Sequence, residues 1–327
     1  MAGVILALGL MAQPVLGGER PVRIRVASGA TSIVIPILFQ KPEILRHLQR
    51  SYVPDFVFFA GSSPQIQALG ARELDIAWLA FASFPLAILN AKLDLRITAD
   101  LIQETKDSYS AVRGVLEPSS ITRIEDLKGK RIGIIAFGTG SDLGTRAMLK
   151  RHGLEYLRDY RLVEVRPPNM EAMLREGKID LAWFDAGFWH RAQGKGGIRP
   201  LFRGTDIFGT VQVLVQVARQ EFLSRNREVV IDFYEDYLRG LRWALDGTQR
   251  EEVIKLAARY FKLPEAAMRG YYLTKADYYR DPDGIPNIEV FQKDIDLMHE
   301  MGVLPQKFDA GRYLDLSYIK EARRRLN

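Results

Sequence analysis

Short apolar, β-branched segments alternate along most of the chain with amphipathic stretches. The apolar segments lie at 22–27, 55–60, 74–80, 130–136, 160–165, 179–186 and 211–217. Each has the composition of a buried strand, and the stretches between them carry apolar residues at helical spacing. The alternation predicts an α/β fold with mixed, mostly parallel sheets and crossover helices. Beyond Arg219 the strand pattern stops, and a helical C-terminal segment is predicted that ends in LSYIKEARRRL at 316–326.

The strand pattern repeats within the chain. RIRVASGATS at 23–32 corresponds to RIGIIAFGTGS at 131–141, and LDIAW at 74–78 corresponds to IDLAW at 179–183 at nearly the same offset. Internal repeats of this kind decide architecture, so we infer two similar α/β lobes. The cleft between them would meet the carboxyl ends of the strands, where helix N-termini direct free N–H groups outward.

Composition narrows the classes of function. The chain has 327 residues, with 46 basic and 40 acidic side chains and a formal net charge of +6. An excess this dilute does not predict nucleic-acid binding. The absence of Cys excludes disulfides, thiolate metal sites, Cys nucleophiles and the lipid-modified Cys of a lipoprotein. The four His residues have no metal-ligand spacing, and we expect neither a metal nor a cofactor.

The amino terminus resembles an export signal. VILALGLMA at 4–12 is shorter than the roughly 20 residues that span a membrane but has the size of a signal-peptide apolar region. QPVLGG at 13–18 supplies small residues for cleavage, so we interpret 1–18 as a signal peptide and expect a periplasmic protein. No Lys or Arg precedes Arg20, which a start codon assigned too late would explain. The alternative is a frayed apolar terminus.

Four segments taken together resemble a known family. They are SGATS at 28–32, AGSSPQIQALGARELDIAW at 60–78, SSITRIEDLKGKRIGIIAFGTGSDLGTRAMLKRHGL at 119–154 and DLSYIKEARRRL at 315–326. The chain resembles the periplasmic solute-binding proteins of ABC importers, in the group that binds sulfonates, taurine, nitrate and thiamine-pyrimidine precursors. The resemblance begins at Val22, and its most specific part is the run that starts at Asp126.

The resemblance implies a type 2 periplasmic-binding-protein fold, with two lobes joined by a two-strand hinge. Lobe one would comprise 22–110 and 214–327, and lobe two 111–213. It further implies a monomer that captures a small organic anion and delivers it to an inner-membrane ABC permease. A sulfonate, taurine or an aromatic carboxylate is the expected ligand, because oxyanion donors would face one end and an apolar wall the other.

The candidate ligand-binding residues follow the strands. Hydroxyl and glycine residues stand between a strand and a helix start, where they either cap the helix or bind an oxyanion. Aromatic residues and one carboxylate at the ends of the LDIAW and IDLAW strands either face the cleft or belong to the core. Asp185 could bind an amino group, brace the hinge or cap the next helix. The predicted site residues are Thr31, Ser32, Ser62, Ser63, Trp78, Phe81, Thr139, Gly140, Ser141, Asp185 and Phe188.

Two other classes of function stay open. One is an enzyme on the same scaffold, similar to pyrimidine-precursor synthases or menaquinone-pathway dehydratases. The Cys-rich cluster of the synthase cannot form here, and no nucleophile–base pair is readable, so no catalytic residue is predicted. The other is a binder of a cationic, zwitterionic or pyrimidine ligand, held by Asp185 and aromatic rings. The GTGSDLG segment at 138–144 is one residue too long for a dinucleotide-binding fingerprint.

Overall fold

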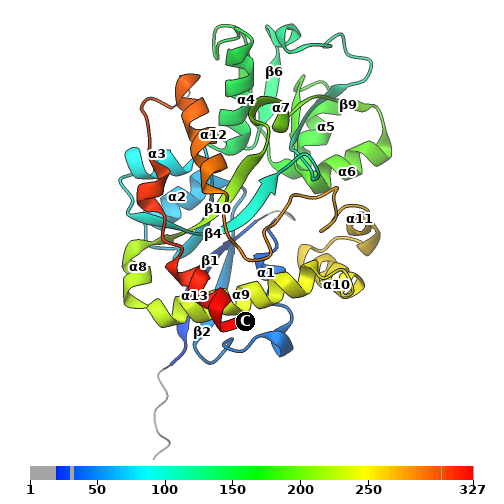
Figure 1. Ribbon diagram of the computed structural model, residues 1–327. Coiled ribbons are helices and arrows are strands. Elements are labelled where there is room, and N and C mark those ends of the chain that lie inside the picture. The colour runs from blue at the N-terminus through cyan, green and yellow to red at the C-terminus, as the bar shows by residue number, and fades with distance from the viewer. Residues whose placement is uncertain (1–19, 30–32, 303, 327) are drawn as a thin grey trace, which may run out of the picture.

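The computed structural model describes residues 20–29, 33–302 and 304–326. The predicted signal peptide at 1–18 and the candidate residues Thr31 and Ser32 lie outside the described residues. Figure 1 shows an α/β protein in which one lobe, at the bottom of the view, is built from both ends of the chain and the other from its middle. We call these lobe one and lobe two.

Lobe one is built on a five-stranded sheet with the order β2-β1-β3-β10-β4. Strand β1 pairs in parallel with β2 and β3, and β10 runs antiparallel to β3 and β4. The strands are β1 (Val22–Ser28), β2 (Tyr52–Phe58), β3 (Ile76–Ala80), β4 (Leu95–Glu104) and β10 (Val211–Arg219). The sequence pattern predicted four of these strands and missed β4, in which Arg96, Asp100 and Gln103 interrupt the apolar run.

Lobe two repeats this arrangement. Its sheets have the orders β6-β7 and β8-β5-β9, and a parallel bridge from Ile132 to Leu181 connects them. The combined order β7-β6-β8-β5-β9 therefore matches β2-β1-β3-β10-β4, which confirms two similar lobes. The strands are β5 (Val112–Leu116), β6 (Arg131–Ile134), β7 (Arg161–Glu164), β8 (Ala182–Phe184) and β9 (Ile198–Arg203).

The sheets are mixed, as predicted, but contain fewer parallel pairs than the alternation of strands and helices suggested. The difference comes from β10 and β5, each of which runs antiparallel to both of its neighbours. Each of these strands is the first that the chain forms after it crosses from one lobe to the other. The crossings run from β4 to β5 and from β9 to β10. These two crossings form the two-strand hinge. The predicted lobe boundaries at 110–111 and 213–214 stay a prediction.

Helices cover the sheets of both lobes, and after β10 the described chain is helical, as predicted. The long helix α9 packs its buried face against the rest of lobe one. There the Phe233 ring stacks on Phe39, with ring centroids 5.2 Å apart. Lobe one contains α1 (Ile35–Leu38), α2 (Ser62–Gly70), α3 (Phe84–Leu89), α8 (Gln220–Arg225), α9 (Arg227–Leu245), α10 (Arg250–Phe261), α11 (Glu265–Arg269), α12 (Ile288–Glu300) and α13 (Ser317–Leu326). Lobe two contains α4 (Gly140–Arg151), α5 (Met170–Arg175), α6 (Ala186–Lys195) and α7 (Thr205–Phe208). None of the helices in the described ranges is long and apolar enough to cross a membrane.

Candidate functional site

A cavity of about 120 Å³ lies between the lobes. Residues from β3 and α2 of lobe one, from α4 and β8 of lobe two and from the hinge strands all line it. The volume is somewhat smaller than the roughly 150 Å³ of an engineered cavity that holds benzene. The cavity can therefore enclose an acidic group with a few carbon atoms. We call it the inner cavity.

The structure brings most of the predicted site residues together at the inner cavity. Ser63 and Phe188 are not among its lining residues: Ser63 hydrogen-bonds across the lobes, and Phe188 lines an adjoining cavity. Contact of any of these residues with a ligand stays a prediction. The predicted residues that line the inner cavity are Ser62, Trp78, Phe81, Thr139, Gly140, Ser141 and Asp185.

The predicted hydroxyl residues at the starts of α2 and α4 do not act as side-chain caps. Neither α2 nor α4 has a side-chain cap hydrogen bond at its N-cap residue. The hydroxyl of Thr139 donates to the carbonyl of Ala136 over 2.7 Å and lies 2.8 Å from the hydroxyl of Ser141. Ser141 Oγ accepts from the N–H of Ile135, and because the Thr139 proton goes to Ala136, Ser141 donates its own proton to Thr139 Oγ1. Both hydroxyl protons are therefore used within the strand-to-helix loop of lobe two, where they fix the shape of the loop at the cavity.

Arg113, on β5, places a buried positive charge at the inner cavity. Its side chain is 4% exposed, and it donates from Nη1 to the carbonyl of Ala111 over 3.1 Å and from Nε to Thr145 Oγ1 over 3.3 Å. It forms no ion pair with any carboxylate in the part of the chain that the structure describes. Burial lowers the pKa of Arg113, partly offset by the charge of Glu104. A buried guanidinium without a paired carboxylate is a strong anion-binding group.

Arg113 was not among the predicted site residues, because the sequence pattern did not reveal strand β5. One signal was available: a single Arg within the apolar run AVRGVL at 111–116. Neighbouring Gly144 leaves space for the guanidinium, since a Cβ at that position would lie 3.2 Å from Nη2. Gly144 also lines the cavity.

Two buried carboxyl groups, Glu104 and Asp185, also reach the inner cavity. Glu104 accepts from the N–H of Ala111 over 3.0 Å and from the hydroxyl of Ser110, and burial raises its pKa. Asp185 is the N-cap of α6 and accepts from the N–H of Phe188 over 3.0 Å. Burial raises the pKa of Asp185 to about 6.

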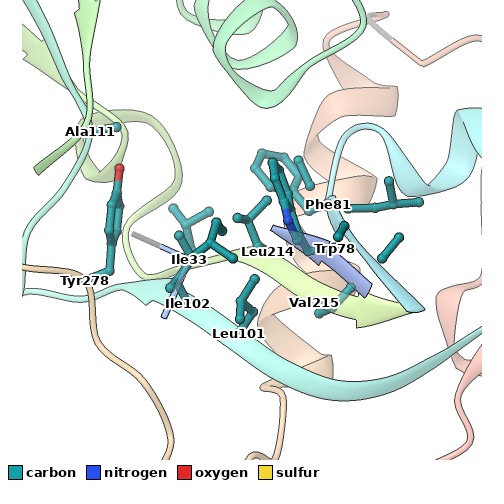
Figure 2. Close-up of a cluster of buried hydrophobic side chains, with 14 of the residues drawn as sticks. Ile33, Trp78, Phe81, Leu101, Ile102, Ala111, Leu214, Val215 and Tyr278 are labelled. Carbon is teal, nitrogen blue, oxygen red and sulfur yellow. The ribbon is translucent and has the colours of Figure 1, made fainter. Parts of the chain in front are cut away.

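Both chain segments that form lobe one contribute to the apolar wall of the inner cavity. Figure 2 shows Trp78 and Phe81 next to each other, with Leu214 and Ile102 close by. The Phe81 ring meets Phe208 of lobe two edge-on, with centroids 5.2 Å apart. Trp78 Nε1 is buried and has no hydrogen-bond partner among the described residues. Since a buried indole N–H normally finds an acceptor, it is available to a ligand in the cavity.

We expect the raised pKa of Asp185 to make stability depend on pH. The folded protein holds this proton up to about pH 6, whereas the unfolded chain releases it near 3.8. The free energy of unfolding therefore falls as pH rises through this window, by up to about 1.4 kcal/mol per pH unit. Asp185→Asn keeps a capping oxygen and removes the titration. Denaturant titration from pH 4 to 7 would measure the free energy of unfolding of both proteins. As pH rises, the value for the variant should increase relative to that for the parent. Parallel curves would contradict the assignment.

Two serine hydroxyls of lobe one hold the strand-to-helix loop of lobe two. Ser63 Oγ donates to the carbonyl of Phe137, and Ser83 Oγ to the carbonyl of Gly138, each over 2.6 Å. The loop is fixed within its own lobe, because the N–H of Gly138 donates to Asp142 and that of Phe137 to Glu164. The lobes are thus closed over the inner cavity.

Ser83→Ala should weaken ligand binding about fivefold, because one hydrogen bond of about 1 kcal/mol that favours the closed form is lost. Calorimetry with an anion that binds the parent protein would measure the change. Ser224→Ala is the matched control, since Ser224 donates to the carbonyl of Gln220 within one helix of lobe one. Equal affinity in the two variants would show that the contact does not favour closure.

Comparison with known proteins places the chain in a family. A family model described as NMT1/THI5 like matches residues 61–250. The chain belongs to the NMT1/THI5-like family. It is 24% identical over 256 residues to an aliphatic sulfonates-binding protein of Escherichia coli (strain K12), covering 72% of this chain and 78% of the relative.

Solved structures confirm the periplasmic-binding-protein fold. The periplasmic aliphatic sulphonate binding protein SsuA from Escherichia coli superposes with a TM-score of 0.66 at 22% identity, covering 92% of this chain and 99% of that one. The periplasmic nitrate-binding protein NrtA from Synechocystis PCC 6803 gives a TM-score of 0.73 at 12% identity, covering 94% and 89%. The desulfurization enzyme DszB has the same fold, with a TM-score of 0.61 at 13% identity over 94% of this chain and 100% of that one.

Proposed function

We propose that this NMT1/THI5-like protein is the substrate-binding component of an ABC importer and captures a small organic anion in the inner cavity. The observation that carries the proposal is Arg113, a guanidinium buried at the cavity without an ion pair in the described part of the chain. A buried charge is costly unless it is paired, so binding of an anion would satisfy a group that the protein itself leaves unpaired.

An acidic head group and a short apolar body fit the cavity best. Trp78 Nε1 supplies a further donor beside Arg113, and Phe81 and Leu214 supply an apolar wall. A sulfonate has three oxygens that can accept these hydrogen bonds at once. The similarity to an aliphatic sulfonates-binding protein supports the same ligand class.

An aminosulfonate such as taurine is the second candidate ligand. Glu104 and Asp185 could receive its ammonium group while Arg113 receives the sulfonate. A purely cationic ligand fits less well, because it would leave the Arg113 charge unpaired and add a like charge beside it.

Binding without chemistry is supported over catalysis, although DszB shows that the fold can host an enzyme. No His is among the described residues that line the inner cavity. Both buried serines there, Ser62 and Ser141, accept hydrogen bonds from backbone N–H groups and have no base positioned to take their proton. We further propose a periplasmic location and an inner-membrane permease as partner, in line with the predicted export signal.

A ligand screen tests the proposal. Protein refolded free of carried-over ligand would be unfolded thermally with methanesulfonate, taurine, benzoate, nitrate, putrescine and uracil. A ligand that binds only the folded state stabilises it by about 4 kcal/mol at a thousandfold excess over Kd. Stabilisation by sulfonates or carboxylates is expected. Stabilisation by putrescine alone, or by none of the anions, would overturn the proposal.

A further inference from the structure

A second, larger cavity of about 720 Å³ adjoins the inner cavity. The two share Ala60 of lobe one and Pro167 of lobe two as lining residues, so they meet where the lobes face each other. We call the second cavity the vestibule. Aromatic side chains from both lobes line it, namely Phe58, Phe59, Phe188, Phe261 and Tyr271.

The aromatic lining of the vestibule reaches solvent at Phe58. Phe58, the last residue of β2, is 66% exposed, more than any other large apolar residue in the described part of the chain. The lobes also meet near the vestibule, because Gly270, next to the lining residue Tyr271, lies so close to the His190 ring of lobe two that a Cβ would overlap it. A cavity lined by aromatic side chains from both lobes, one of them exposed, is typical of a ligand-binding site.

The vestibule is also positively charged. Arg166 and Arg191 line it, and no acidic residue is among its described lining residues. Arg166 is exposed and forms no ion pair with any described carboxylate. Arg191 Nε lies 3.9 Å from Glu171, but that single carboxylate also pairs with Arg175 at 2.8 Å and Lys195 at 3.1 Å. The local charge therefore favours an anion.

Arg191 is held in place by an aromatic ring. Its Cζ atom lies 4.8 Å from the centroid of Phe188, in a cation–π contact. Phe188 itself follows Asp185, whose carboxylate accepts the N–H of Phe188 and faces the inner cavity. The first turn of α6 therefore contributes to both cavities and connects them structurally.

We propose that the vestibule is a second ligand compartment, which binds the aromatic body and a second acidic group of an extended organic dianion. This inference rests on the proposed function, because the first acidic group would lie beside Arg113. The inner cavity is too small for a head group and a ring together, whereas the vestibule offers aromatic faces for the ring and Arg166 and Arg191 for the second acid. The substrate class is then an aromatic sulfonate or carboxylate with a second acidic substituent.

Calorimetry on the intact protein with three probes tests the inference. Methanesulfonate fills the inner cavity only, benzenesulfonate adds the ring and 4-sulfobenzoate adds the second acid. We expect each step to tighten binding by roughly tenfold. The double variant Arg166→Gln, Arg191→Gln should remove the gain of 4-sulfobenzoate over benzenesulfonate. Its affinity for methanesulfonate, which does not reach the vestibule, should change by less than about twofold.

The outcomes separate the two proposals. Arg312→Gln, an exposed arginine that lines neither cavity, is the matched control and should keep the full gain. Equal affinity for the three probes, or a gain that persists in the double variant, would overturn the vestibule inference and leave the proposed function standing. No binding of any probe to the parent protein would overturn this inference, and absence of stabilisation by every anion of the ligand screen as well would overturn the proposed function.

Discussion

Arg113→Gln is expected to weaken anion binding by roughly 100- to 1000-fold, equivalent to about 3–4 kcal/mol. Arg113 is the only described lining residue of the inner cavity with a permanent positive charge, and its side chain is already buried before a ligand arrives. Glutamine keeps polar hydrogens but loses the charge. Isothermal titration calorimetry with the tightest anion of the screen would measure the loss.

The stability of the Arg113→Gln protein should match or exceed that of the parent, because an unpaired buried charge is removed. A loss of affinity without a loss of stability would show that Arg113 binds the ligand and is not needed for folding. Arg199→Gln is the matched control, since Arg199 is a half-buried arginine of β9 that donates to the carbonyl of Ile121 and lines neither cavity. Parent affinity in a folded Arg113→Gln protein would refute the anion-binding role of this residue.

Asp236→Ala is expected to lower the free energy of unfolding by about 3–5 kcal/mol. Asp236 lies on α9, is fully buried and accepts four hydrogen bonds. Its donors are the N–H groups of Arg46, His47 and Leu48, at 2.7, 2.9 and 3.0 Å, and the hydroxyl of Tyr52 at 2.8 Å. Alanine would leave these four donors without their acceptor and would weaken the attachment of the loop before β2 to α9.

Chemical denaturation would measure the effect of Asp236→Ala. Tyr52→Phe removes one of the four donors and should lower the free energy of unfolding by about 1 kcal/mol. Asp246→Ala, at an exposed aspartate just after the same helix, serves as the matched control and should change it by less than about 0.5 kcal/mol. A loss below about 1 kcal/mol in Asp236→Ala would show that water replaces the carboxylate.

The internal repeat explains why the fold was predictable. Strands β1 and β6 begin the repeated segments, and each lies beside the strand of the second repeat in its own sheet. Patterning alone could not reveal β4, β5 and β9, because polar residues or a proline interrupt their short apolar runs. Of the four strands that lead into or out of the hinge, the sequence pattern therefore revealed only β10.

The site residues that could be predicted are those that follow the carboxyl end of a strand, where ligands bind in α/β sheets. Ser62, Thr139 and Ser141 stand between a strand and a helix at the same edge of similar sheets, and they meet at the inner cavity. Phe188 does not, because the first turn of α6 carries it from the inner cavity to the vestibule. Arg113 lies on a strand that the pattern did not reveal, and its contact with Gly144 joins segments far apart in the sequence.

The chain leaves lobe one after β4 and returns to it with β10, and this path affects the order in which the protein folds. Lobe two is one continuous stretch of chain, whereas the sheet of lobe one needs β10, which is synthesised after all of lobe two. Until residues 211–219 arrive, β3 and β4 lack the strand that lies between them and both expose unpaired edges. Long-range pairing of this kind folds slowly and is prone to aggregation. A nascent chain that emerges from its amino terminus would therefore complete lobe two first and close lobe one last.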